Sequence, residues 1–491
     1  MSALFANTIL LIIYSALTLV KVNIIIKYYG AEINSIFQVA SQIFMYLVLF
    51  ESGLNAAYLY KMYAPMNIKN YMKLNSLYLG LSQSLKKIAF RMFLMLIPVC
   101  ILYAVLTNTK KINLLGTFLI IFLMGIRFII PYYVSLSKKT LLIVYEYRYL
   151  VDALDGFINV CTIILEMLLV IVYKISLWSL LSVGIIMNVL GGSLYSFIVK
   201  KMCKESVGNT VVPSFEGESM TKDLIVHQVG SLVNNNIDIL ILSMYNLFSV
   251  SVYQAYNTLI SYPIQYFNHV SETFRAIFGI KLVLEDKKVY EMFQVLMVVH
   301  VFAAMVIAPV FLTTSSIFVQ CWIGKEYILK NVDICLFGLL LIHRLLINPI
   351  YIIRDGRGMY HESKWYTMIQ SIINLVLSLI LIVPFGITGL LLGTVIATFC
   401  FCAPCNYYLV YCKIFHRNMM IYIDYFFIFL STILSVVISN YILGKHLEMG
   451  WFICIKNVCL QTIIAVVIGA SILVLYKGKY CILLIKKWRN S

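Results

Sequence analysis

Long apolar windows recur along the whole chain with short polar gaps between them, and no other feature limits its possible folds as much. A bilayer core about 30 Å thick is crossed by a helix of ~20 mostly apolar residues, because a helix pairs its own backbone polar groups. We therefore expect an all-α polytopic membrane protein with about 14 transmembrane helices. The windows predict spans at 3–26, 35–60, 87–106, 114–136, 151–173, 177–199, 224–248, 250–277, 291–314, 333–353, 365–383, 387–411, 422–443 and 453–476.

Composition and loop lengths exclude several classes of protein. Hydrophobic residues make up 62% of the 491 and charged residues 12%, whereas a soluble domain is about half apolar and a quarter charged. The predicted outer loops are all short, so none could fold into the external domain that membrane glycosyltransferases and polysaccharide polymerases generally carry. The P-loop pattern G-x-x-x-x-G-K-[ST], which binds ATP, does not occur either.

The positions of the basic residues predict the orientation. If the N-terminus is inside, most of the 38 Lys and Arg residues fall in the inner loops, as the positive-inside rule expects. Both termini are then cytoplasmic, and the N-terminal stretch is interpreted as the first span and not as a removable signal peptide. The net charge of +17 is spread through juxtamembrane loops, which favours anionic lipids over nucleic acid as partners.

A polar stretch at 201–223, which contains NTVVPSFEGES, is interpreted as a cytoplasmic linker between two halves. Six spans precede it in 1–200, six follow in 224–414, and two accessory helices with a basic cytoplasmic tail occupy 415–491. Repeated halves are a common plan of secondary transporters. A weak repeat is indicated by three pairs at one common offset, Tyr29/Tyr245, Phe37/Tyr253 and Gln38/Gln254.

Segment 67–90 mixes apolar and basic residues at roughly helical spacing. Two interpretations remain open for it. It is either a helical cytoplasmic extension of the third span lying along the membrane interface, or an ordinary loop with a helical turn or two.

No metal, cofactor or catalytic residue is expected. The CFCAPC run at 400–405 has a C-x-x-C spacing, but it lies in a predicted span without a second pair or a nearby His. His269, Glu272 and Arg275 lie near one face of a helix. One His cannot form the two-His motif of a metalloprotease, so a local ion pair is the better interpretation.

Cations inside the spans carry the functional signal. Arg127 and Arg344 lie near the middle of the fourth and tenth spans, where a charge usually faces a cavity or a partner. Guanidinium groups bind phosphate oxygens bidentately, so these residues would suit a phosphate-bearing substrate, with an internal salt bridge or a helix carbonyl partner as the alternative. Lys21 is a further candidate near the outer end of its span, where snorkelling competes. Arg275 and Arg354, near inner span ends, complete the set of candidate phosphate-binding cations.

Four acidic residues in the spans are candidates for neutralising these cations or for coupling to an ion, because a desolvated carboxylate can cycle a proton as access alternates. For Asp155, near the inner end of its span, solvation by the cytoplasm is the simpler explanation. The set is Glu51, Asp155, Glu166 and Asp238.

Three stretches carry distinctive motifs. They are KYYGAEINSIFQVASQIFMYLVLFESGLNAA at 27–57, HQVGSLVNNNIDILILSMY at 227–245 and NLVLSLILIVPFGITGLLLGTVIAT at 374–398. The third contains a pattern formed by Asn374, Ser378, Phe385, Gly386, Gly389, Gly393 and Thr394, and the first contains Tyr29-Gly30 and Glu51-x-Gly53-Leu54. In these motifs the chain resembles bacterial polysaccharide repeat-unit flippases (Wzx-type transporters) of the multidrug/oligosaccharidyl-lipid/polysaccharide (MOP) exporter superfamily. The second-half counterpart Tyr245-Asn246 departs from the family pattern.

The resemblance implies a MATE-like fold and a flippase in the bacterial cytoplasmic membrane. Such proteins move an undecaprenyl-diphosphate-linked oligosaccharide from the cytoplasmic to the external leaflet for O-antigen, capsule or related surface polysaccharides, without hydrolysing ATP. Basic cavity residues would meet the diphosphate, and glycosyltransferases and a polymerase of the same pathway would be partners. We expect alternating access, ion-coupled, with a groove between spans 1–6 and 7–12. The alternatives are a multidrug or metabolite cation antiporter, a polymerase or glycosyltransferase, and a scaffold without transport.

Overall fold

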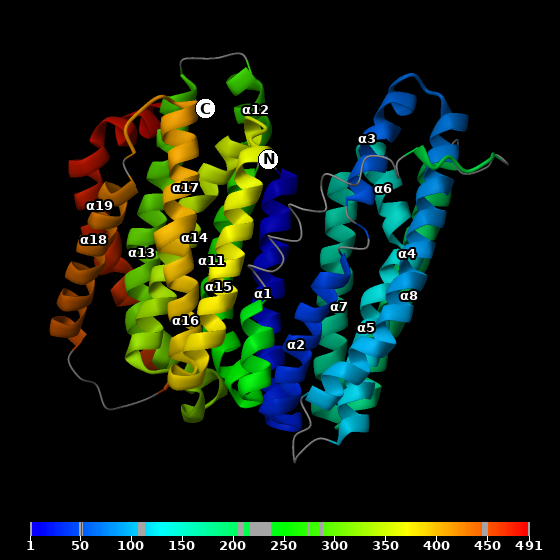
Figure 1. The fold of residues 1–491 in the computed structure, drawn as a ribbon, viewed down its shortest axis with the longest axis horizontal. Coiled ribbons are helices and arrows are strands. Elements are labelled where there is room, and N and C mark those ends of the chain that lie inside the picture. The colour runs from blue at the N-terminus through cyan, green and yellow to red at the C-terminus, as the bar shows by residue number, and fades with distance from the viewer. Residues whose placement is uncertain are drawn as a thin grey trace. The chain divides into compact units, whose positions relative to one another are not determined.

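The computed structural model describes residues 2–48, 51, 53–106, 113–204, 211–216, 237–272, 274–283, 288–419, 421–443 and 450–489. The described elements are all helices, without a strand among them (Figure 1). The chain divides into two compact units, Met1–Ser251 and Val252–Ser491, with the division falling inside one helix. The finer division at 200, 223 and 414 stays a prediction.

The first unit is built from helices that pack in pairs, α1 against α7, α4 against α5 and α5 against α8. Gly30 separates α1 from α2 in a positive-φ conformation (93°), which explains why glycine occurs there. The Ser176 side chain accepts a hydrogen bond from the Ser179 backbone N–H and caps α8. The helices are α1 (Ser2–Tyr29), α2 (Ala31–Leu47), α3 (Leu54–Asn67), α4 (Tyr71–Leu106), α5 (Leu114–Val134), α6 (Leu136–Val144), α7 (Arg148–Tyr173) and α8 (Leu177–Met202), followed by helical residues 237–245.

Helix α4 is longer than a membrane span. Its 36 residues extend about 54 Å, whereas the hydrocarbon core is about 30 Å thick. The helical interpretation of segment 67–90 is therefore confirmed from Tyr71 onward. With α3 it forms a hairpin at one end of the first unit (Figure 1).

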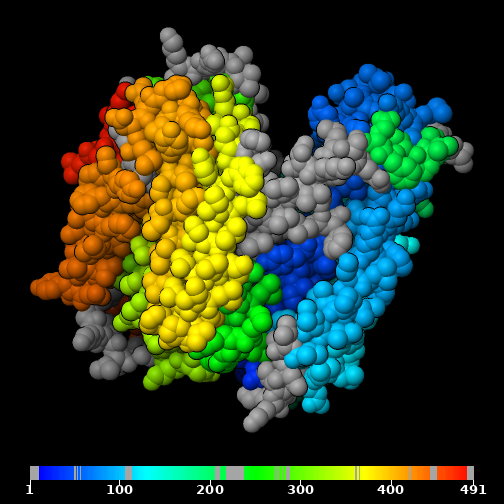
Figure 2. All heavy atoms as spheres, viewed as in Figure 1, coloured from blue at the N-terminus to red at the C-terminus, as the bar shows by residue number. Residues whose placement is uncertain are grey.

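The linker-like segment 211–216 packs on this hairpin. Its Ser214 N–H donates to the Ser76 carbonyl over 2.9 Å, and the Ser76 hydroxyl donates to the Val212 carbonyl over 2.6 Å. Gly80 gives the segment room, because a Cβ there would overlap the Ser214 carbonyl. Figure 2 shows the segment, in green, against the blue surface of the hairpin.

In the second unit α14 is the most enclosed helix, and α13 packs against α14, α18 and α19. The helix between 387 and 414 contains two π-helical stretches around Pro404. The helices are α11 (Leu247–Glu272), α12 (Arg275–Val283), α13 (Val289–Ile323), α14 (Asn331–Gly356), α15 (Tyr360–Phe385), α16 (Ile387–Ile396), α17 (Ala403–Tyr407), α18 (Ile421–Leu443) and α19 (Trp451–Arg489), with the short helices η3 (Lys325–Tyr327), η4 (Ala397–Cys402) and η5 (Tyr408–Ile414).

The turn between α15 and α16 forms where the sequence interrupts its apolar run with Pro-Phe-Gly. Gly386 is the single residue between the helices and has a φ of 59°. A Cβ on Gly389 would overlap the Leu381 carbonyl, so the absence of a side chain lets the two helices approach closely. Asn374 Oδ1 accepts hydrogen bonds from the Ser378 and Thr394 hydroxyls, both 3.1 Å away. The small and hydroxyl residues thus lie at a helix contact.

Eleven described helices are long and apolar enough to cross a membrane, and each matches one of the fourteen predicted spans. The chain is a multi-pass membrane protein. Three predicted spans are not among the eleven. Within 35–60 the structure describes α2 up to Leu47 and α3 from Leu54, and most of 224–248 lies outside the described residues. The third, α11, is helical but rich in polar residues such as Gln254 and Asn257. The count of fourteen therefore stays a prediction.

Candidate functional site

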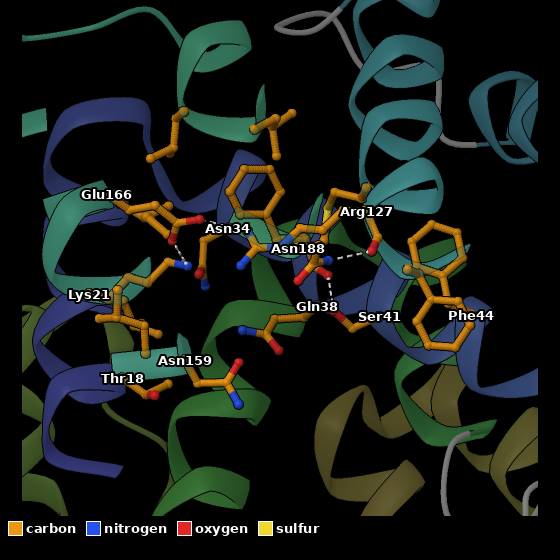
Figure 3. Close-up of a pocket in the computed structure, with 18 of the residues that line it drawn as sticks. Thr18, Lys21, Asn34, Gln38, Ser41, Phe44, Arg127, Asn159, Glu166 and Asn188 are labelled. Atoms are coloured by element: carbon orange, nitrogen blue, oxygen red, sulfur yellow. Dashed lines mark hydrogen bonds and ion pairs between the residues drawn. The ribbon is translucent and has the colours of Figure 1, made fainter. Parts of the chain in front are cut away.

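A cavity of about 600 Å³ lies within the first unit, lined by α1, α2, α5, α7 and α8. Aromatic and aliphatic side chains form much of its wall, and Phe44 stacks on Phe128 with ring centroids 5.6 Å apart. Three charged residues, Lys21, Arg127 and Glu166, line it as well. Figure 3 shows these groups together with the neutral polar residues Thr18, Asn34, Gln38, Ser41, Asn159 and Asn188.

Glu166 on α7 holds the centre of the charged group. Its side chain is 1% exposed, and each carboxylate oxygen takes one cation. Arg127 Nη1 lies 2.7 Å from Oε1, and Lys21 Nζ forms an ion pair with Oε2. A carboxylate buried this deeply is stable only when it is paired, because desolvation of a lone charge costs several kcal/mol. Residues from two other helices therefore supply the partners that this buried carboxylate requires.

Helix α8 shapes the surroundings of Arg127. A Cβ on Gly184 would overlap the Arg127 guanidinium, so the glycine lets that group lie against the α8 backbone. One turn further on, Asn188 Nδ2 donates to the Arg127 main-chain carbonyl over 2.8 Å. That carbonyl lacks its helical donor because residue 131, four positions later, is a proline. Gly184 therefore leaves room for the Arg127 side chain, and Asn188 binds the Arg127 main chain.

The charges in the cavity do not balance, since two cations surround one carboxylate. Lys21 is 21% exposed and Arg127 31% exposed, whereas Glu166 is almost inaccessible. A ligand entering the cavity can reach both cations but not the anion. The neutral amides of Gln38 and Asn159 add donors and acceptors around them, whereas the buried Asn34 amide donates to the Ser251 hydroxyl. This arrangement suits an anionic ligand that also carries hydroxyl groups.

The other predicted cations lie in the second unit. Arg344 on α14 is partly buried and donates to Asn257 Oδ1 over 3.3 Å; no carboxylate of the described residues pairs with it. Arg275 pairs with Glu272 at 2.6 Å, as the sequence spacing indicated, and with Asp355 at 2.9 Å. Arg354 is buried against Asp355 and Asn406. Its charge and that of Arg275 are thus compensated locally.

The remaining acidic candidates lie outside the cavity lining. Asp155 pairs with Lys139 at 2.7 Å and accepts a hydrogen bond from the Tyr195 hydroxyl. Glu51 accepts one from Tyr132, which itself lines the cavity. Asp238 is buried in helical residues 237–245. Within the described ranges, no three His, Cys, Asp or Glu residues come together as a metal site would require.

Sequence reasoning missed two features of the structure, the neutral residues of the cavity and an ion pair in the second unit. The neutral cavity residues Asn34, Gln38, Asn159 and Asn188 gave no signal, although Pro131 four residues after Arg127 marks a carbonyl that needs another donor. Asp424 and Lys477 form a buried ion pair at 2.7 Å between α18 and α19. In the sequence, Asp424 lies near the start of one predicted span and Lys477 directly follows the end of the next. Both therefore resemble ordinary interfacial charges.

The fold is shared with solved membrane transporters. The structure of a lipid II flippase MurJ in an inward closed conformation superposes with a TM-score of 0.68 at 14% identity, covering 96% of this chain and 99% of that one. The structure of the MATE multidrug transporter DinF-BH superposes with a TM-score of 0.59 at 12% identity, covering 85% of this chain and 96% of that one. The structure of an inward-facing MATE family transporter of the MOP superfamily superposes with a TM-score of 0.58 at 12% identity, covering 78% of this chain and 91% of that one.

No family model matches the sequence, and no curated protein matches it. At identities of 14% and below, the structural likeness establishes the architecture alone. The chain thus has a MurJ- and MATE-like helical fold, and evidence about its function must come from the residues that line its cavity.

Proposed function

We propose that this chain is a flippase that moves an undecaprenyl-diphosphate-linked oligosaccharide repeat unit from the cytoplasmic to the external leaflet of a bacterial cytoplasmic membrane by alternating access. The observation that carries the proposal is the surplus of accessible positive charge in the cavity, where Lys21 and Arg127 surround Glu166. The fold supports it, because a similar structure belongs to a lipid II flippase.

The physical problem that such a protein solves matches the contents of the cavity. A diphosphate and many hydroxyls crossing hydrocarbon each lose their water, which costs several kcal/mol for every unpaired polar group. Cations replace the hydration of the phosphates, and amides such as Gln38 and Asn159 replace that of the hydroxyls. A volume of about 600 Å³ is in the range of sites for small polar ligands. The polyprenyl tail needs no such shelter and stays in lipid.

The wider proposal keeps the organisation that the sequence predicts. Two six-helix halves do the transport, two C-terminal helices are accessory, and both termini are cytoplasmic. Arg344, with no carboxylate beside it in the described structure, is proposed as a second phosphate contact. Anionic lipids, glycosyltransferases and a polymerase of the same pathway are the proposed partners.

A cation antiporter is the second candidate, because MATE multidrug transporters share the fold. A cationic drug entering this cavity would meet two accessible cations, while the carboxylate that could attract it is 1% exposed. Like charges in a low-dielectric cavity repel strongly. The balance of charge therefore favours the flippase.

The test is the sidedness of the lipid-linked oligosaccharide in spheroplasts depleted of the protein, read with an impermeant lectin. Intact units that the lectin reaches only after lysis are expected, and Arg127→Ala should fail to restore outside labelling. Arg148→Ala is the matched control, because this arginine lies on α7 with a side chain 74% exposed. Units accumulating outside without polymerisation would indicate a polymerase, and no accumulation on either side would favour the antiporter.

A further inference from the structure

We propose that the two C-terminal helices α18 and α19 enclose a binding site for a row of water molecules within the second unit. The site is separate from the cavity of the first unit and does not depend on the proposed function. It is marked by buried polar side chains with oxygen or nitrogen atoms that have no hydrogen-bond partner among the described residues. We call them the polar stripe: Ser431, Thr432, Ser435 and Ser439 on α18, and Asn457 and Gln461 on α19.

Helical spacing brings the members of the polar stripe to one face of each helix. Ser431, Ser435 and Ser439 follow one another at intervals of four residues, and all three are 0% exposed. Asn457 and Gln461 repeat this interval on α19. Helices α18 and α19 pack against each other and against α13 (Figure 1). The polar stripe therefore lies inside the contact of these three helices and not on their lipid side.

Two contacts give the register of α18 on α19. Lys477 Nζ lies 2.7 Å from Asp424 Oδ1 near the start of α18 and toward the end of α19. Further along α18, the Ser431 hydroxyl lies 3.8 Å from the position that a Cβ on Gly469 would occupy. The chain thus advances on α18 by about as many residues as it goes back on α19, so the two helices are antiparallel.

This register places small residues opposite the serines. Gly469 is opposite Ser431, and one turn further Ala465 is opposite Ser435. Neither a glycine nor an alanine offers a side-chain hydrogen-bonding group, and neither fills the space in front of a hydroxyl with a large side chain. The facing helix therefore leaves both room and unused hydrogen-bonding capacity at these two serines.

The serines of the polar stripe also lack the usual partner of a hydroxyl within a helix, the carbonyl four residues earlier. Elsewhere on α19, Thr462 donates to the Val458 carbonyl over 2.7 Å and Ser471 to the Val467 carbonyl over 2.8 Å. Within the described part of the chain, the three serine hydroxyls make no such bond. Buried polar groups almost always have a partner, so these atoms indicate a ligand.

Water fits the spacing and the charge of the polar stripe. Residues four apart on one helix are separated by about 6 Å along its axis. A water molecule with two hydrogen bonds of about 2.8 Å each spans nearly this distance. One water between successive serines would give each hydroxyl a partner, and the Gln461 amide supplies a further donor and acceptor. An ion is a poorer ligand, because the polar stripe contains no charged group to balance it.

The row of water ends before the buried ion pair of Asp424 and Lys477. Ile428 on α18 and Leu473 on α19 occupy the turn between this pair and Ser431, and both are buried. Apolar side chains offer no hydrogen bond to a water molecule at this level. The ion pair therefore stays dry, and its two charges depend on each other.

The experiment is X-ray radiolytic footprinting of the full chain in lipid nanodiscs, in which hydroxyl radicals formed from water oxidise side chains beside it. Met305 on α13 is the internal reporter, because it is 0% exposed and its Cβ lies 3.2 Å from the position of a Cβ on Gly469. Met92 on α4 is equally buried and is the control. Met305 should be oxidised severalfold faster than Met92. Equal rates would overturn the inference, and this measurement requires no variant.

A second experiment uses the sign of a change in stability. If the hydroxyls bind water, the triple variant Ser431→Ala/Ser435→Ala/Ser439→Ala should lower Tm by about 2 °C or more relative to a matched control. Hydroxyls that are unpaired in a dry contact would give the opposite sign, because removing them removes a desolvation cost. Ser471→Ala is the control for helix propensity, since its exposed hydroxyl bonds only its own helix. A triple variant as stable as this control, or more stable, would overturn the inference.

Discussion

The side-chain amide of Asn188 on α8 donates to the main-chain carbonyl of Arg127 on α5 over 2.8 Å. Pro131 removes the helical donor for this carbonyl, and the neighbouring helix replaces it with an amide. The same turn of α5 directs the Arg127 side chain toward Glu166, 2.7 Å away. The proline, the amide and the ion pair therefore belong to one local arrangement, which links helix packing to the charge of the cavity.

This arrangement predicts a coupling between two substitutions. Asn188→Leu should destabilise the protein by about 1 kcal/mol, because it leaves a partly buried carbonyl without a donor. In a Pro131→Ala background, where the helix regains its own hydrogen bond, the same change should cost much less. Thermal unfolding of the four proteins in detergent measures the coupling. Equal effects of Asn188→Leu in both backgrounds would show that the amide does not serve the freed carbonyl.

Gly184→Ala should abolish flipping although it removes no charged group. The added Cβ would occupy the position of the Arg127 guanidinium and force it away from Glu166. Gly191→Ala is the control on the same helix, because its Cβ would meet only the Ile158 side chain, at 3.1 Å. Lectin labelling of spheroplasts measures both variants at matched expression. Wild-type labelling with Gly184→Ala would mean that the position of Arg127 is unimportant.

Sequence periodicity predicted the helices of this protein well, because the bilayer requires each span to be apolar and internally hydrogen-bonded. The turn at Gly386 could be predicted because it depends on local residues. For the segment before the third span the sequence left a helix and a loop open, and the structure shows a helix from Tyr71 onward. Helix α11 shows the limit of this reasoning. The predicted span at 250–277 is helical over Leu247–Glu272, but its many polar side chains keep it out of the helices apolar enough to cross a membrane.

The candidate site could be predicted only as separate residues. Lys21, Arg127 and Glu166 each stood out as ionisable groups within apolar spans, but nothing in the sequence paired them. Lys21 and Glu166 are 145 positions apart and meet because α1 packs on α7. The neutral amides gave no signal, because Asn and Gln are common at contacts between membrane helices.

Asp424→Asn should destabilise the second unit strongly. Lys477 is 6% exposed and Asp424 0% exposed, so removing the carboxylate charge leaves a buried ammonium without its counter-ion. Breaking a buried pair in this way costs about 3–5 kcal/mol. The double variant Asp424→Asn/Lys477→Met should recover much of the loss, because no lone charge remains. Thermal unfolding in detergent is the measurement.

The matched control for this pair is Arg148 with Asp152 on α7. Arg148 Nε and Asp152 Oδ2 lie 3.9 Å apart, and both side chains are exposed. Asp152→Asn should change stability by less than about 1 kcal/mol, because solvent screens exposed pairs. If Asp424→Asn were no more harmful than Asp152→Asn, water or lipid headgroups would have to reach Lys477.

The docked segment 211–216 gives the last prediction. Gly80→Leu should release this segment from the α3–α4 hairpin, because the Cβ of the new side chain would overlap the Ser214 carbonyl. The backbone at Ser214 cannot move away while the segment stays hydrogen-bonded to Ser76. Losing two hydrogen bonds of about 1 kcal/mol each raises the undocked population roughly 10-fold or more.

Limited proteolysis in inside-out vesicles measures this release as faster cleavage within 211–216. Gln83→Leu adds a similar side chain to an exposed position of the same helix and should leave cleavage unchanged. Transport in the Gly80→Leu protein then separates two roles of the segment. Faster cleavage with normal flipping would make the docking a matter of stability, whereas a parallel loss of flipping would make the docked segment part of the transport cycle. Unchanged cleavage would contradict the docking itself.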